Sequence, residues 1–110
     1  MTKSYYTEYV RHALRFYTRN LLMSRFKSEA DKDNWYACAN VIKAYSDQNR
    51  DIIIKVYSGY DTLSDNVFEA ARRYNVNQSV VWDLMKEVKH NMAKRRGLIG
   101  GGDNYGRKRQ

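Results

Sequence analysis

The sequence contains no proline and only one cysteine, Cys38, and each of these features restricts the folds that the chain can adopt. Proline interrupts helices because it fixes one backbone dihedral and lacks an amide donor, so its absence suits long continuous helices. A lone cysteine excludes an internal disulfide and a cysteine metal cluster, which favours a reducing, cytoplasmic location. We therefore expect Cys38 to pack as a small hydrophobic residue rather than to react.

Long hydrophobic runs are also missing. The densest is Ile52-Ile53-Ile54, whereas a membrane-spanning helix needs about 20 apolar residues. The N-terminal residues lack the apolar region of a signal peptide. These features predict no membrane association.

Residues suited to catalysis or metal binding are few. His12 and His90 are the only histidines. Neither has a metal-ligand partner at a suitable spacing, and neither has a nucleophile beside it. The sequence predicts no metal site, no cofactor and no enzymatic activity.

The chain is one domain by length, since its 110 residues are 43% hydrophobic and provide one modest core. Helical spacing of apolar residues predicts an all-α fold of about five helices. We expect an N-terminal helical hairpin over 1–46, a second part over 47–97, and a disordered Gly-rich basic tail over 98–110. The expected helices cover about 4–23, 28–45, 48–58, 62–74 and 77–96.

Capping patterns support these boundaries. Ser28 and Thr62 are each followed three residues later by Asp, as in a capping box, and Ser46-Asp47 suits the start of the third helix. Gly59 is expected to end that helix. The apolar faces are predicted to comprise Tyr6, Val10, Ala13, Leu14, Tyr17 and Leu21; Trp35, Cys38, Val41, Ile42 and Tyr45; Ile52, Ile53, Val56 and Tyr57; Val67, Ala70, Ala71 and Tyr74; and Val81, Leu84, Met85, Val88 and Met92.

The first helix carries two further features. Arg11, Arg15 and Arg19 recur every four residues, and we interpret this stripe as a solvated face rather than a nucleic-acid contact. The helix is also rich in aromatic residues, which suit a self-association surface as well as a core. A homodimer through the N-terminal helices is therefore a hypothesis.

The last two predicted helices have the spacing of a helix-turn-helix. Ala71 is a small residue where two helices can cross closely, and Asn75 four residues later suits a left-handed turn. Val76 follows as an anchor, with Val81 and Leu84 on one face of the next helix. This arrangement is typical of DNA-binding proteins, although a bundle corner without a ligand has the same pattern.

Charge is concentrated in the same region. From Arg72 to Gln110 there are ten Lys or Arg and three acids, a net charge of +7, which leaves only +1 of the total +8 for the other residues. Such an asymmetry indicates that this end of the chain binds a polyanion.

The second half of the chain also contains motifs of a known family. They are Arg50, Ile52-Ile53, Tyr57, Thr62-Leu63, Ala70-Ala71, Asn75-Val76, Val81 and the basic cluster Lys94-Arg95-Arg96. With these residues, 47–96 resembles region four of bacterial sigma factors and their small phage relatives. The first 46 residues do not match that family. The resemblance implies a small phage or mobile-element regulator of transcription rather than a full sigma factor, with RNA polymerase as a further partner.

For a chain that binds duplex DNA, the N-terminal turns of the last helix would enter the major groove. Gln78 suits a bidentate contact with adenine, and Ser79 can reach a base or a phosphate. Trp82 would contact a thymine methyl group or sugar, or pack against the third helix or another subunit. The predicted DNA-binding residues are Arg72, Arg73, Asn77, Gln78, Ser79, Trp82, Lys86, Lys89, Lys94, Arg95 and Arg96.

Two other classes of function fit the same sequence. A helical module that binds polymerase or another regulator would use the exposed aromatics and would not need Arg72, Arg73 or Lys86. An RNA-binding or packaging protein would use the basic tail, where Tyr105 can stack on a single-stranded base.

Overall fold

The chain folds into five α-helices, as the sequence predicted, and the described residues contain no strand. The computed structural model describes residues 3–98, with side chains from Tyr6 onward. The helices are α1 (Lys3–Thr18), α2 (Glu29–Ile42), α3 (Asp47–Ser58), α4 (Leu63–Tyr74) and α5 (Gln78–Arg95). The predicted tail over 98–110 lies outside the described residues except for Leu98, which packs against the core.

Three helices begin at the residues that the sequence marks as caps. The side chains of Ser28, Ser46 and Thr62 each accept a hydrogen bond from the amide three residues later, at 3.1–3.2 Å. Each bond satisfies one of the amide donors that a helix leaves free at its N-terminus.

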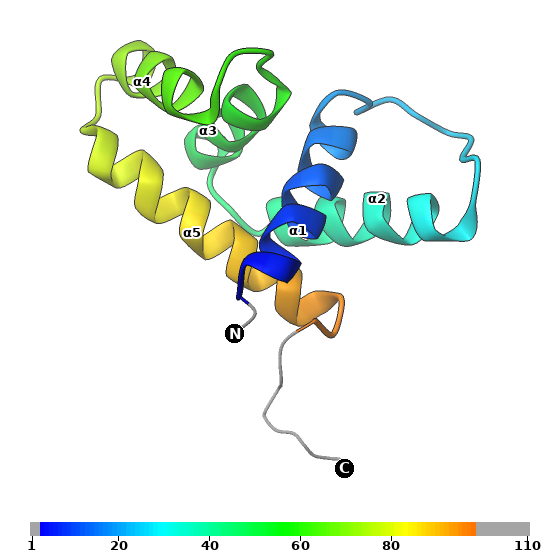
Figure 1. Ribbon diagram of the computed structural model, residues 1–110. Coiled ribbons are helices and arrows are strands. Elements are labelled where there is room, and N and C mark those ends of the chain that lie inside the picture. Colours follow the sequence, from blue (N-terminus) through cyan, green and yellow to red (C-terminus); the bar gives the residue numbers. More distant parts are fainter. Residues whose placement is uncertain (1–2, 99–110) are drawn as a thin grey trace.

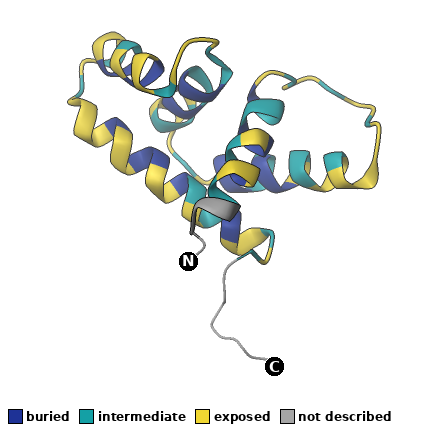
Figure 2. Ribbon diagram, viewed as in Figure 1, coloured by how far each residue is buried: buried dark blue, intermediate teal, exposed yellow. Residues whose placement is uncertain are grey.

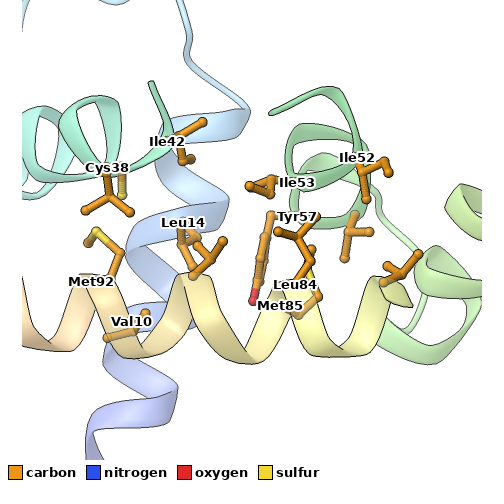
Figure 3. Packing of buried hydrophobic residues seen from close by; sticks show 14 of the residues in the cluster. Val10, Leu14, Cys38, Ile42, Ile52, Ile53, Tyr57, Leu84, Met85 and Met92 are labelled. Carbon is orange, nitrogen blue, oxygen red and sulfur yellow. The ribbon is translucent and has the colours of Figure 1, made fainter. Parts of the chain in front are cut away.

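The long helix α5 joins the two halves of the molecule (Figure 1). Its N-terminal half contacts α3 and α4 and its C-terminal half contacts α1 and α2, while α1 also packs directly on α2 and α3 (Figures 1 and 3). The two parts of the described chain, α1–α2 and α3–α5, therefore share one core.

That core contains apolar side chains from all five helices (Figure 3). Tyr57 is the largest fully buried side chain, and its ring points from α3 towards α5 beside Leu14 and Met85. The predicted inward residues of the third and fifth helices are all buried: Ile52, Ile53, Val56, Tyr57, Val81, Leu84, Met85, Val88 and Met92. Cys38 is also buried, as expected, and burial raises its pKa to about 12.

The first helix is shorter than predicted, because it ends at Thr18 rather than near residue 23. Side chains compete for the carbonyl groups of its last turn: the Thr18 hydroxyl donates to the carbonyl of Arg15, and Asn20 Nδ2 donates to that of Phe16. Such local bonds offer the backbone an alternative to the helix. Leu21 consequently lies outside the helix and is 39% exposed, so its assignment to the apolar face was wrong.

The second helix ends at Ile42, three residues before the predicted Tyr45. Tyr45 still packs against the core, and its hydroxyl accepts a hydrogen bond from Asn91 Nδ2 on α5 at 2.9 Å. Trp35, expected on the apolar face, is half-buried among Tyr17, Phe26 and Tyr36. Its indole N–H donates to the carbonyl of Asn20 at 2.8 Å, which fixes the α1–α2 connection to α2.

The arginine stripe on α1 is more than a solvated face. Arg19 donates hydrogen bonds to the carbonyls of Ser58 and Gly59 at the end of α3, at 3.3 and 2.7 Å, and stacks on the Tyr60 ring at 3.9 Å. A cation is favourable at the C-terminus of a helix, where unpaired carbonyls concentrate negative charge. Arg19, just past the end of α1, therefore ties that end to α3, whereas Arg11 pairs with Glu8 of its own helix.

Gly59 follows the last residue of α3 as predicted, but its backbone is not left-handed. Its φ of −67° is open to any residue. A Cβ at this position would lie 2.5 Å from Oδ1 of Asn66, a buried side chain whose Nδ2 donates to the carbonyl of Val56. Glycine is required because Asn66 packs tightly on the backbone here.

Candidate nucleic-acid interface

The turn between α4 and α5 has the left-handed residue that the sequence predicts. Asn75 has φ 56° and ψ 49°, the only positive φ of a non-glycine residue in the described part of the chain. The amide of Val76 donates to the carbonyl of Ala71 at 3.0 Å, which closes the end of α4 as a Schellman motif. The chain thus reverses within three residues, Asn75 to Asn77, and starts α5.

Small and apolar side chains hold the two helices together. Ala70 and Ala71 of α4 are buried, as are Val81 and Leu84 of α5, while Val76 in the turn packs partly buried against the same core. These are the residues expected to anchor a helix-turn-helix. The inward faces of α4 and α5 are therefore buried in the core, and their opposite faces remain available to a ligand.

Most of the predicted DNA-binding residues lie on those outer faces (Figure 2). The exposed members of the set are Arg72, Arg73, Asn77, Gln78, Ser79, Trp82, Lys86, Lys94 and Arg95. They form two groups. The first surrounds the turn and the N-terminal half of α5; the second, Lys94 and Arg95, begins about 12 Å beyond Lys86 along the helix axis, at 1.5 Å per residue. Within the second group, Arg95 lies on the side of α2, where it shares a small pocket with Asp33 and Tyr36.

The start of α5 differs from the starts of α2, α3 and α4. Asn77 occupies the N-cap position with extended backbone, yet its side chain makes no capping hydrogen bond. The exposed side chains of Asn77, Gln78 and Ser79 therefore surround backbone amides that no cap covers. Free amides and the helix dipole favour an anion at this position.

The charge around the turn is mixed. Arg72 pairs with Glu69 at 2.7 Å, and this contact lowers the pKa of the Glu69 carboxyl, first through the hydrogen bond and then through charge. Asp83 and Glu87 are exposed on α5 near Lys86. The positive charge of this surface is thus partly offset, which the sequence count over 72–110 does not reveal.

Two of the predicted residues are less accessible. Lys89 is half-buried, and its pKa is lowered, mainly by burial and further by Arg11 and Lys86. Arg96 follows α5 and donates from Nε to Oδ1 of Asn34 on α2 at 2.8 Å. Arg96 also interacts with the Tyr9 hydroxyl on α1, and this hydrogen-bonding interaction is the main cause that lowers the pKa of Tyr9. Arg96 therefore joins three helices on the side of the N-terminal hairpin.

The binding residues predicted from the sequence do not include Phe68, a prominent side chain of this surface. Phe68 on α4 is 51% exposed, beside the buried Val67. The signal was present, because Phe68 lies off the buried stripe of Val67, Ala70 and Ala71 at helical spacing. An exposed aromatic of this size suits contact with a partner.

The described part of the chain is an all-α fold in which a tight turn with left-handed backbone joins α4 to α5. Comparisons with known protein families, curated proteins and solved structures find no match for the chain. Within residues 3–98, no helix is long and apolar enough to cross a membrane, and no three His, Cys, Asp or Glu side chains gather as a metal site.

Proposed function

We propose that the chain binds duplex DNA through α4 and α5 and acts as a small, sigma-like transcription regulator of a phage or mobile element. One observation carries the proposal: the left-handed turn at Asn75 buries the inner faces of both helices and leaves the uncapped start of α5 exposed. The sequence motifs over 47–96 add the likeness to region four of sigma factors.

In this proposal the first turns of α5 enter the major groove. Gln78 pairs with adenine through its amide, and Ser79 contacts a base or a phosphate. Trp82, which is 38% exposed, packs on a thymine methyl group or a sugar. Asp83 is the acid nearest to these residues in the helix, and it disfavours phosphate there, so it limits the register in which α5 can lie.

The basic residues position the protein on the backbone rather than select a sequence. Arg73 and Lys86 are exposed and make no ion pair in the described part of the chain, so both are available for phosphate contacts. When the chain binds DNA, Arg72 leaves its ion pair with Glu69 and contacts a phosphate instead. Lys94 reaches the backbone further along the duplex, whereas Arg95 lies on the side of α2. Arg96 is left out of the interface because it is half-buried and its guanidinium lies against α2, where Asn34 accepts its Nε–H.

A charge-matched pair of variants tests the proposal. Arg72→Gln, Arg73→Gln and Lys86→Gln together remove three proposed phosphate contacts, whereas Lys27→Gln, Lys32→Gln and Lys43→Gln remove three exposed bases outside α4 and α5. Fluorescence anisotropy with mixed-sequence duplex DNA should show that the first triple variant loses about 3 from the salt slope of log K. The control triple should lose less than about 1.

Equal losses in the two triple variants would contradict the helix-turn-helix as the binding surface. Competition with single-stranded RNA in the same assay separates duplex recognition from an RNA-binding function. Duplex DNA should compete better than the RNA.

A protein-interaction module is the second candidate function. The exposed Phe68 and the acids Asp83 and Glu87 favour it, because they suit a protein surface better than a phosphate backbone. RNA polymerase is the partner that the sigma-like motifs imply. Under this alternative, the Arg72, Arg73 and Lys86 triple variant would bind polymerase like the unmodified chain, while Phe68→Ser would not.

The proposal also includes a homodimer through the N-terminal hairpin, since one small domain offers little surface for tight, specific DNA binding. Leu22 is 98% exposed in the α1–α2 connection, and Tyr36 on α2 is 50% exposed. Sedimentation of Leu22→Ser and Tyr36→Ser variants tests this contact.

A further inference from the structure

A pocket in the N-terminal hairpin lies apart from the helix-turn-helix. It has a volume of about 500 Å³ and is bounded by α1, by the connection over 19–28 and by α2. This volume is within the range of sites that hold small organic molecules, about 300–1,000 Å³. The proposed contacts with DNA do not involve it.

Apolar side chains form one part of the pocket wall. Phe16 comes from α1, and Met23 and Phe26 come from the connection; all three are half-buried. Ala13 completes this part with a side chain too small to fill it. Phe26 is itself held by Trp35 and Tyr36, with ring centroids 5.9 and 6.0 Å away, so its place in the wall is fixed by α2.

The polar part of the wall is mainly cationic. Arg25 and Lys27 lie on either side of Phe26 in the sequence, and both line the pocket with exposed side chains. Asp31 is the only acid of the wall within the described residues, so the fixed charge at neutral pH is positive. A wall that combines an aromatic face with two cations is complementary to an aromatic ring that carries an anion.

Asn34 supplies an oriented donor in the second turn of α2. Its Oδ1 accepts from Arg96 Nε at 2.8 Å and from the Tyr9 hydroxyl at 3.1 Å. An arginine Nε–H can only donate, so the amide oxygen must face Arg96 and the Nδ2 group points elsewhere. Among the described residues, Nδ2 has no hydrogen-bond acceptor. Asn34 lines the pocket, so this donor is available to a bound carboxylate.

We propose that this pocket binds a small aromatic carboxylate. The ring lies among Phe16, Met23 and Phe26, and the carboxylate lies between Arg25, Lys27 and the Asn34 amide. A ligand bound there contacts Asn34, whose Oδ1 accepts the Nε–H of Arg96, so binding changes the surroundings of Arg96. Arg96 follows the C-terminal end of α5, and the N-terminal end of the same helix forms the proposed DNA contact.

Naphthalene-2-carboxylate is a suitable probe, with naphthalene-2-methanol as its uncharged counterpart. Isothermal titration of the full chain should give a Kd on the order of 0.1–1 mM for the carboxylate, as expected for a ligand of this size. The alcohol should bind about ten-fold more weakly, because it lacks the charge that Arg25 and Lys27 recognise. In NMR spectra, the carboxylate should shift the Arg96 Nε–H resonance.

A matched pair of variants makes the test specific to the pocket. Arg25→Gln with Lys27→Gln should weaken carboxylate binding about ten-fold and leave the alcohol unchanged. Lys32→Gln with Lys43→Gln removes the same charge outside the pocket and should change neither. Equal affinity for the two probes, equal effects of the two double variants, or no binding at 2 mM probe would overturn the proposal. None of these outcomes depends on DNA binding, so the two proposals can fail separately.

Discussion

Asn75 determines how α4 turns into α5. Its left-handed backbone, with φ 56°, costs an ordinary L-residue about 1–2 kcal/mol, a cost that is smallest for Gly and Asn. The Ala71–Val76 hydrogen bond forms only when the chain takes this conformation. The geometry of the helix-turn-helix thus depends on a single residue that could be recognised from its sequence context.

The first prediction concerns this residue. Asn75→Gly should keep the stability within about 0.5 kcal/mol, whereas Asn75→Val should lower the free energy of unfolding by about 1–2 kcal/mol, because a β-branched side chain strains the left-handed turn. Urea denaturation followed by circular dichroism measures both variants. Equal stability of the two would show that the turn does not require the left-handed conformation.

Buried ionisable groups predict how stability depends on alkaline pH. Burial raises the pKa of Tyr57 to about 12, and it is also the main cause that raises the pKa of Tyr45 to about 12. Unfolded tyrosine ionises near pH 10. Because the folded pKa is the higher one, the stabilising contribution is complete below about pH 10 and is lost as the pH rises towards 12.

The free energy of unfolding should therefore fall between about pH 9 and pH 12, where the buried Cys38 thiol, with its pKa of about 12, acts in the same direction. Tyr57→Phe should reduce this fall by about 2 kcal/mol. Tyr60 is 84% exposed, so Tyr60→Phe provides the control variant. An unchanged pH profile in Tyr57→Phe would contradict the burial of the neutral phenol.

At the level of the helices, three of the five N-caps could be predicted from Ser and Thr positions because capping is a local interaction. The end of α1 could not, since the local bonds of Thr18 and Asn20 act together with a distant one, from Trp35 of α2 to the carbonyl of Asn20. The role of Arg19 was missed for a similar reason: its partners lie 39 and 40 residues further along the chain. Helical spacing shows which face is apolar, but it does not show which polar residues bind another helix.

The caps of α4 and α5 give a prediction at this level. Thr62→Ala should cost about 1 kcal/mol, because Thr62 accepts the amide of Asp65 at 3.1 Å. Asn77→Ala should cost less than about 0.5 kcal/mol, since Asn77 makes no capping bond, yet it should weaken DNA binding. Thermal denaturation and anisotropy together separate the two effects. A large loss of stability in Asn77→Ala would assign it a capping role instead.

For the whole molecule, the apolar pattern was sufficient to predict five helices and most of the core. It did not predict how charge is distributed in space. Arg96 and Arg72 both add to the positive charge counted from the sequence. In the structure, however, Arg96 binds Asn34 on α2, and Arg72 binds the carboxylate of Glu69. The pocket between α1 and α2 was also beyond prediction, because it forms where a ten-residue connection folds back over two helices.

The central claim is that the folded helix-turn-helix, rather than the basic residues after it, binds duplex DNA. The most direct test is the salt dependence of binding by a chain truncated after Leu98, which retains α5 and its packed end. We predict that binding persists with a slope of log K against log salt of about −4, from phosphate contacts by Arg72, Arg73, Lys86 and Lys94. Loss of binding on truncation, or a slope near zero, would contradict the account.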